Sequence, residues 1–176
     1  SKSIISSIQK ICGYISEVDI YFALAEISSQ NSWCKPIVDE SDSITIENGR
    51  HPVIESLLKK DGKLFVKNSL EITEHSTLFI VTGPNMGGKS TYLRQNALIV
   101  LLAQIGSFVP ADSAEIGVVD KIFTRVGASD NLTAGESTFM VEMLEAATIL
   151  KNATAKSLVI LDEVGRGTST FDGMSL

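Results

Sequence analysis

The stretch that decides the fold runs from residue 83 to residue 90 and reads Gly83-Pro84-Asn85-Met86-Gly87-Gly88-Lys89-Ser90. It matches the phosphate-loop pattern G-x-x-x-x-G-K-[ST] in full. Glycines let the backbone curl so that several N–H groups point inward at a phosphate, and the positive end of a following helix dipole adds to them. We expect Lys89 to reach the β- and γ-phosphates and Ser90 to offer its hydroxyl to Mg²⁺, with Thr91 as a second hydroxyl.

The flanks of this stretch favour a phosphate loop over the alternative, a glycine-rich turn with a solvated lysine. Residues 77–82 form an apolar run of strand length, which suits a parallel strand covered on both faces. Residues 89–105 predict a helix, and a second helix is expected over 139–151. Further strands are expected at 114–117, 121–125 and 157–161. Because strands and helices alternate, the sequence predicts an α/β fold, a P-loop NTPase with a largely parallel sheet.

Two carboxylates follow the apolar run 158–161 directly. At the end of a strand, Asp162 can orient the Mg²⁺ shell, usually through water, and Glu163 can polarise the attacking water. Alone the pattern is weak, because a buried strand often ends in acids at its solvent edge. Together with the loop at 83–90 it predicts a Mg²⁺-dependent ATPase whose cofactors are ATP or ADP and Mg²⁺.

The N-terminal residues predict one long helix over 3–29, since apolar residues recur there at alternating spacings of four and three. A helix docked in a core and a coiled-coil lever both remain open. Residues 31–36 end the helix, so we place a boundary near residue 35, with a helical arm at 1–35 and the P-loop domain at 36–176. Within that domain we expect strands at 43–47 and 64–66 and a short helix at 51–58.

Composition restricts the function classes. The net charge is −6 and no Lys/Arg run is present, so this stretch is not expected to be a main DNA-gripping surface. No apolar run approaches the roughly 20 residues of a membrane span, and we expect no membrane partner. The two cysteines and two histidines have no metal-site spacing, which indicates reduced thiols in a cytoplasmic protein.

Four ordered segments, residues 82–95, 123–128, 135–143 and 162–173, resemble motifs of the MutS family of DNA mismatch repair proteins. Residues 49–53 are similar to the family's sequence at the start of its ATPase domain. The resemblance covers essentially the whole chain. It implies an ATP-binding and ATP-hydrolysing switch that couples nucleotide state to mismatch recognition made elsewhere in the protein.

The resemblance also implies a composite nucleotide site. Residues 85–91, Asp162 and Glu163 would act on their own subunit's ATP, whereas Ser137 and Thr138 would approach the ATP of a second MutS-type subunit. Phe65 matches the position whose ring packs on adenine, with Asn68 close by; a core role for Phe65 is the alternative. His51 resembles a structural histidine of the family.

Mismatched duplex DNA would be bound by parts absent from this chain, which we expect to be a C-terminally truncated piece of a bacterial, nucleoid-associated homodimer. A nucleotide-binding interaction module with little hydrolysis is the main alternative, although Glu163 favours hydrolysis. A small-molecule kinase would need an Arg-rich lid and an acceptor site, and neither is found. A transporter ATPase would carry a Leu-Ser-Gly-Gly-Gln signature, where this chain reads Gly-Glu-Ser-Thr at 135–138.

Overall fold

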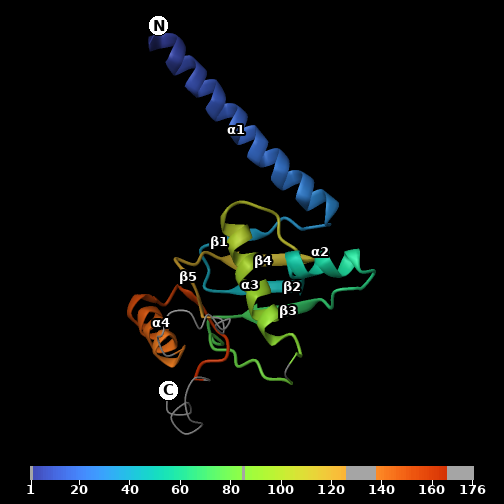
Figure 1. Cartoon of the computed structure of the whole chain (residues 1–176), viewed down its shortest axis with the longest axis vertical. Helices are drawn as coiled ribbons and strands as arrows, with labels where there is room; N and C mark the ends of the chain where they lie inside the picture. The colour runs from blue at the N-terminus through green and yellow to red at the C-terminus, as the bar shows by residue number, and fades with distance from the viewer. Residues whose placement is uncertain (1, 85, 126–137, 166–176) are drawn as a thin grey trace.

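The structure, a computed structural model, describes residues 2–84, 86–125 and 138–165 (Figure 1). Their elements follow the order α1 (Lys2–Gln30), β1 (Ile37–Asp39), β2 (Ile44–Gly49), α2 (Pro52–Lys60), β3 (Asn68–Ile72), α3 (Lys89–Gln104), β4 (Ser113–Gly117), β5 (Ile122–Arg125), α4 (Thr138–Asn152) and β6 (Leu158–Leu161). The α/β class and the long first helix are confirmed.

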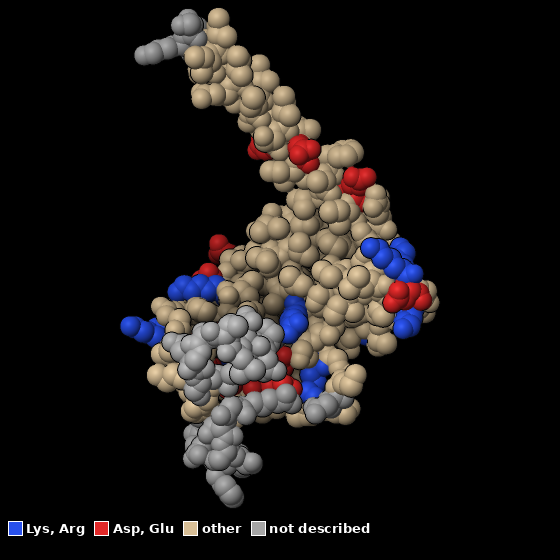
Figure 2. Space-filling view, in the orientation of Figure 1, with Lys and Arg blue, Asp and Glu red and all other residues tan. Residues whose placement is uncertain are grey.

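Helix α1 extends away from the rest of the molecule (Figure 1). Its apolar stripe is exposed: Ile8, Ile15 and Phe22 keep 54%, 63% and 67% of their surface accessible. The described residues therefore do not form a core around this helix, and the lever role stays a prediction. Figure 2 shows that the visible face of the arm is mostly uncharged. Among the described helices, none combines the length and the apolar character that a bilayer span requires.

The larger sheet of the described chain has the strand order β1-β4-β2-β3 and is mixed. β1 pairs parallel with β4, while β2 pairs antiparallel with both β4 and β3. β5 and β6 form a separate parallel pair. The expectation of a largely parallel sheet is therefore wrong. β2 buries Ile44 and Ile46 on one face, while Thr45 and Glu47 on the other face are half-buried and exposed, and this one-sided burial is typical of antiparallel strands.

Residues 77–82 were expected to be a buried parallel strand, and this expectation is wrong for the described structure. They pair with no strand, and Leu78 and Ile80 are 81% and 82% exposed. A cavity of about 430 Å³, lined by residues of both segments, separates this run from β6. A strand is defined by its ladder partners, so apolar character alone does not make one here.

The strand expected at 64–66 is also wrong. Leu64 and Val66 are exposed, and β3 begins instead at Asn68, which pairs with Gly49 beyond a bulge in β2. The register of that pairing sets where the strand starts. The remaining expected helices and strands are confirmed within a residue or two.

The hydrophobic core lies between α3 and the larger sheet (Figure 1). Its fully buried side chains come from α3, β2, β4 and the segment before β4: Ile46, Ile99, Val100, Val109 and Ile116. Fully burying such a side chain contributes about 1.5–3 kcal/mol. This packing fixes α3, and the first turn of α3 carries Lys89 and Ser90, so the core positions the end of the glycine loop at 83–90.

Candidate functional site

The backbone of the loop at 83–88 follows from its glycines. Gly88 has a φ of +84° and is the N-cap of α3, in the left-handed region that glycine enters without steric cost. The Gly87 N–H donates to the Pro84 carbonyl at 3.1 Å, and a Cβ at Gly87 would lie 2.9 Å from the same oxygen. The two adjacent glycines therefore permit the tight curl that leads into the helix.

Lys89 lies over this loop. Its ammonium donates to the carbonyls of Gly83 and Pro84 at 2.7 and 2.9 Å. Gly88 has no side chain to cap α3, so the positive end of the helix dipole and the Lys89 charge share one surface. Ser90 and Thr91, both half-buried, follow in the first helical turn. This arrangement favours an anion at the loop.

Asp162 and Glu163 lie just beyond β6 and differ in environment. Asp162 is 5% exposed, and its carboxylate makes no hydrogen bond or ion pair with the described residues. Its backbone N–H donates to the Arg125 carbonyl at 2.7 Å. Glu163 is exposed and has a φ of +56°. Because burial of a charge is costly unless an opposite charge or hydrogen bonds compensate it, the buried carboxyl of Asp162 suits a cation or its water shell.

Helix α3 and strand β6 lie in contact, so the loop-bearing helix and the acid-bearing strand are neighbours. No group of three or more His, Cys, Asp or Glu that could hold an ion occurs within the described ranges. Mg²⁺ at nucleotide sites needs only one or two protein ligands, because substrate phosphates and water supply the others. Ser90 and Asp162 fit that mode of binding.

A cluster of buried charged side chains from β5 and α4 lies beside Asp162, whose backbone N–H donates to Arg125 of this cluster. It was not predicted from the sequence. Arg125 and Glu142 are 6% and 3% exposed, with Arg125 Nη2 3.8 Å from Glu142 Oε1. Glu145 lies 2.8 Å from Arg125 Nε. Glu142 also accepts a hydrogen bond of 2.6 Å from the Gly165 N–H. The cluster therefore connects α4 to the turn that follows β6.

Phe65 lies in the irregular segment before β3 and is half-buried, outside the core. Phe65 is thus not among the buried core residues that the structure describes, and its packing on adenine stays a prediction. Asn68 opens β3, is exposed, and donates to the Val66 carbonyl at 2.9 Å. Lys67 ties the segment to Asp112, with Nζ 2.9 Å from Oδ1, and this hydrogen bond lowers the pKa of the Asp112 carboxyl.

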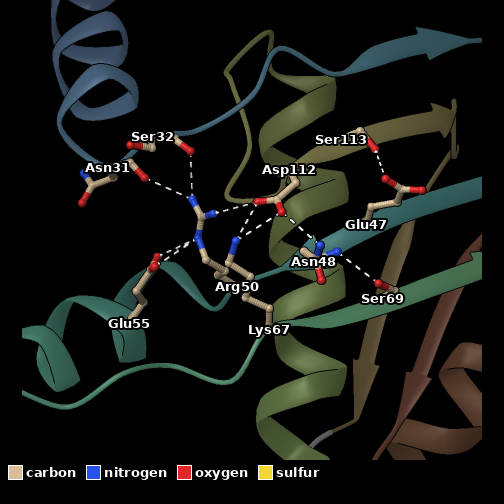
Figure 3. A network of polar contacts seen from close by, with 10 residues as sticks. All are labelled: Asn31, Ser32, Glu47, Asn48, Arg50, Glu55, Lys67, Ser69, Asp112 and Ser113. Atoms are coloured by element: carbon tan, nitrogen blue, oxygen red, sulfur yellow. Dashed lines mark hydrogen bonds and ion pairs between the residues drawn. The ribbon is translucent and has the colours of Figure 1, made fainter.

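Arg50 is the centre of the network in Figure 3. Its buried guanidinium donates to the carbonyls of Asn31 and Ser32 at 3.1 and 3.0 Å, just beyond the C-terminus of α1. It also pairs with Glu55 of α2 at 3.1 Å and with Asp112 at 3.5 Å. One side chain thus joins the arm, α2 and the residues before β4. Sequence reasoning did not single it out.

His51 is buried and caps α2, with Nδ1 accepting from the Ile54 N–H at 3.4 Å. Burial lowers the pKa of His51, which favours the neutral ring that can accept this bond. This matches the expected structural role. Two predicted parts of the site, Asn85 and Ser137, lie outside the described residues. Thr138 begins α4, and its side chain lies outside them as well.

Comparison with known proteins now adds to this geometry. The family model described as MutS domain V matches residues 79–176, which is more than half of the chain.

The chain belongs to the MutS family.

Three bacterial relatives, each named DNA mismatch repair protein MutS, align over nearly the whole chain. The protein of Caldanaerobacter subterraneus is 59% identical over 169 residues, 96% of this chain and 19% of the relative. The protein of Chlorobaculum parvum is 57% identical over 171 residues, which is 97% of this chain and 19% of the relative. The protein of Ruminiclostridium cellulolyticum is 58% identical over 173 residues, which is 98% of this chain and 20% of the relative. The chain spans about one fifth of the length of these curated relatives.

The residues matched by the MutS family model include the glycine loop at 83–90 and the pair Asp162–Glu163. The family resemblance that the ordered motifs indicate is therefore confirmed. Helix α1 and Arg50 precede the residues that the family model matches, whereas Asp112, a partner of Arg50, lies within them. The alignments with the relatives cover 96–98% of the chain.

Proposed function

We propose that this MutS-family chain is the ATP-binding and ATP-hydrolysing switch of a DNA mismatch repair protein. The observation that carries the proposal is the pairing of two sites on neighbouring elements. A curled glycine loop with Lys89 leads into α3, and the buried Asp162 directly follows β6. The first suits a polyphosphate and the second suits its counter-ion.

Nucleotide binding follows from the loop. Its backbone N–H groups and the α3 dipole would hold the phosphates, and Lys89 would exchange its two carbonyl partners for phosphate oxygens, which are stronger acceptors. Mg²⁺ would be held by Ser90 and the phosphates, with Asp162 acting through water. The remaining cofactor-binding residues of the proposal are Gly83, Pro84, Asn85, Met86, Gly87, Gly88 and Thr91.

Hydrolysis depends on Glu163. The residue lies next to Asp162 and is exposed, so its carboxylate could accept a hydrogen bond from the attacking water and hold it in line with the γ-phosphorus. The proposal extends to Phe65 and Asn68 at the adenine and to Ser137 and Thr138 at the ATP of a second subunit. Mismatched DNA would be bound by other parts of a bacterial cytoplasmic protein associated with the nucleoid.

The binding step is tested by Lys89→Ala in the intact protein, with Lys59→Ala as the matched control on the exposed end of α2. Because a charged contact to phosphate is lost, ATP should bind about 10- to 100-fold more weakly to Lys89→Ala, while Lys59→Ala should bind normally. Titration with a fluorescent ATP analogue measures both. Equal affinity of Lys89→Ala and the wild-type protein would remove the phosphate-loop assignment.

The alternative of a nucleotide-binding interaction module with little hydrolysis gains support from the exposed apolar stripe of α1. Glu163→Ala in the intact protein separates the two functions. The switch proposal expects ATP to stay bound while single-turnover hydrolysis falls about 10²- to 10⁴-fold, as is typical of a general base or water-positioning group. Hydrolysis of bound ATP at the wild-type rate would favour the interaction module instead.

A further inference from the structure

Glu163 has a backbone conformation that needs external support. Its φ of +56° lies in the left-handed region, which a non-glycine residue adopts only at a cost in free energy. Such a conformation persists where the surrounding structure over-determines it. The contacts on either side of Glu163 therefore help to hold its backbone turn.

Two hydrogen bonds bracket the Glu163 turn. On one side the Asp162 N–H donates to the Arg125 carbonyl at 2.7 Å, which continues the β5–β6 ladder. On the other side the Gly165 N–H donates to Glu142 Oε1 at 2.6 Å. The first bond comes from the backbone of a neighbouring strand. The second comes from a single side chain of α4, so it can be removed without changing the sheet.

Glu142 is itself fixed by burial and by charge. It is 3% exposed, and the guanidinium of Arg125, 6% exposed, lies 3.8 Å from its Oε1. Arg125 also pairs with Glu145, which is 53% exposed. An ionised carboxylate is a strong acceptor for a backbone N–H. The same oxygen thus faces Arg125 and holds the Gly165 N–H.

Helix α4 begins at Thr138, one turn before Glu142. The side chain that supports the Glu163 turn therefore belongs to the first part of α4. The hydrogen bond from the Gly165 N–H to Glu142 links that part of the helix to the Glu163 turn.

We propose that Glu142 is a positioning residue for ATP hydrolysis, which holds the left-handed turn that aims Glu163 and ties that turn to the start of α4. This inference rests on the proposed function, because it assumes that Glu163 acts on water. It does not require Glu142 to touch the nucleotide.

Two substitutions in the intact protein separate the hydrogen bond from the ion pair. Glu142→Gln keeps the length of the side chain and an oxygen that can accept from Gly165, but loses the charge that faces Arg125. Glu142→Asp keeps the charge but is one methylene shorter, so it no longer reaches Gly165. Glu145→Ala, which removes the surface partner of Arg125, is the matched control.

Single-turnover hydrolysis and ATP affinity give the first readout. We expect Glu142→Asp to slow hydrolysis about 10- to 100-fold, the scale that a misplaced catalytic group costs, with unchanged ATP affinity. Glu142→Gln and Glu145→Ala should stay within about threefold of the wild-type rate. Slow hydrolysis by Glu142→Gln together with a wild-type rate in Glu142→Asp would mean that Glu142 acts through its ion pair with Arg125. Wild-type hydrolysis rates in both variants would mean that Glu142 has no role in catalysis. Each of these two results would overturn the inference.

Hydrogen exchange gives a readout that does not depend on hydrolysis. In peptides that cover residues 161–166, Glu142→Asp should speed exchange of the Gly165 amide about 10- to 100-fold, the scale of a lost hydrogen bond to a charged group, while Glu142→Gln should not. Unchanged exchange in Glu142→Asp overturns the inference. Faster exchange in a protein whose wild type hydrolyses no ATP would support the contact and refute the proposed function, so the two failures are distinguishable.

Discussion

Replacing Arg50 by Met is expected to loosen the junction between α1 and the rest of the chain. The substitution keeps an apolar stem but removes the guanidinium that donates to Asn31 and Ser32 and pairs with Glu55 (Figure 3). Each hydrogen bond to a charged group is worth about 1.5–3 kcal/mol, so three such contacts set an upper range of about 4.5–9 kcal/mol.

The structure reduces that range. The side chains of Glu55 and Asp112 are 29% and 44% exposed, and Ser32 is exposed, so water can replace part of what Arg50 supplies. We therefore expect a loss of about 3 kcal/mol, the low end for breaking a buried ion pair. Converted at 1.36 kcal/mol per decade, this is about a 100-fold change in the local opening equilibrium.

Hydrogen exchange of the amides at the end of α1 measures this change in the intact protein. The Asn31 and Trp33 N–H groups, which donate to Ile27 and Ser28, should exchange about 100-fold faster in Arg50→Met. Lys67→Met is the matched control, because its ion pair with Asp112 is 44% exposed on both sides and should cost no more than about 1 kcal/mol. Equal protection in Arg50→Met and the wild type, or equal loss in both variants, would refute the reasoning.

Three further predictions concern the metal, the sheet and pH. Ser90→Ala should raise the Mg²⁺ concentration that supports half-maximal ATP binding by about tenfold or more, which a magnesium titration measures. Gly117→Ala should destabilise the fold by about 1–3 kcal/mol, because its Cβ would collide with the Ser41 carbonyl; an unchanged urea midpoint would contradict this. Since the Lys67 hydrogen bond lowers the pKa of Asp112, the stability advantage of wild type over Asp112→Asn should be full above the carboxyl's ordinary pKa. This stability advantage should vanish as the pH falls through the lowered pKa of Asp112. Denaturant titrations at several pH values measure it, and a difference in stability that does not change with pH would contradict the prediction.

Elements with a strong local signal follow from the sequence. The alternating spacing in α1, the period-two pattern in β2 and the helical period of α4 each depend on neighbours a few residues away. The backbone of the glycine loop at 83–90 belongs to the same group, because Gly88 adopts its left-handed conformation through the absence of a Cβ. For these elements, knowing nearby residues was enough.

The strands of the sheets and their pairing did not follow from the local sequence in the same way. The run 77–82 has the composition of a buried strand, yet it has no ladder partner across the cavity that separates it from β6. β1 has three exposed residues and gives no burial signal, and β3 starts where Asn68 meets Gly49 rather than at the apolar residues before it. Strand existence, direction and register depend on partners distant in sequence.

Local sequence alone was enough to find the glycine loop at 83–90, the Asp162–Glu163 pair and the ordered motifs of the MutS family. Only the tertiary structure decided what Arg50 and Glu142 do. Both are charged residues that local patterns assign to a solvated surface, yet both are buried because their partners come from elsewhere in the chain. Glu142 meets the amide of a residue 23 positions away, and Arg50 meets the end of a helix 19 positions before it. A charge is buried only where its partners converge, and that convergence is a property of the folded chain.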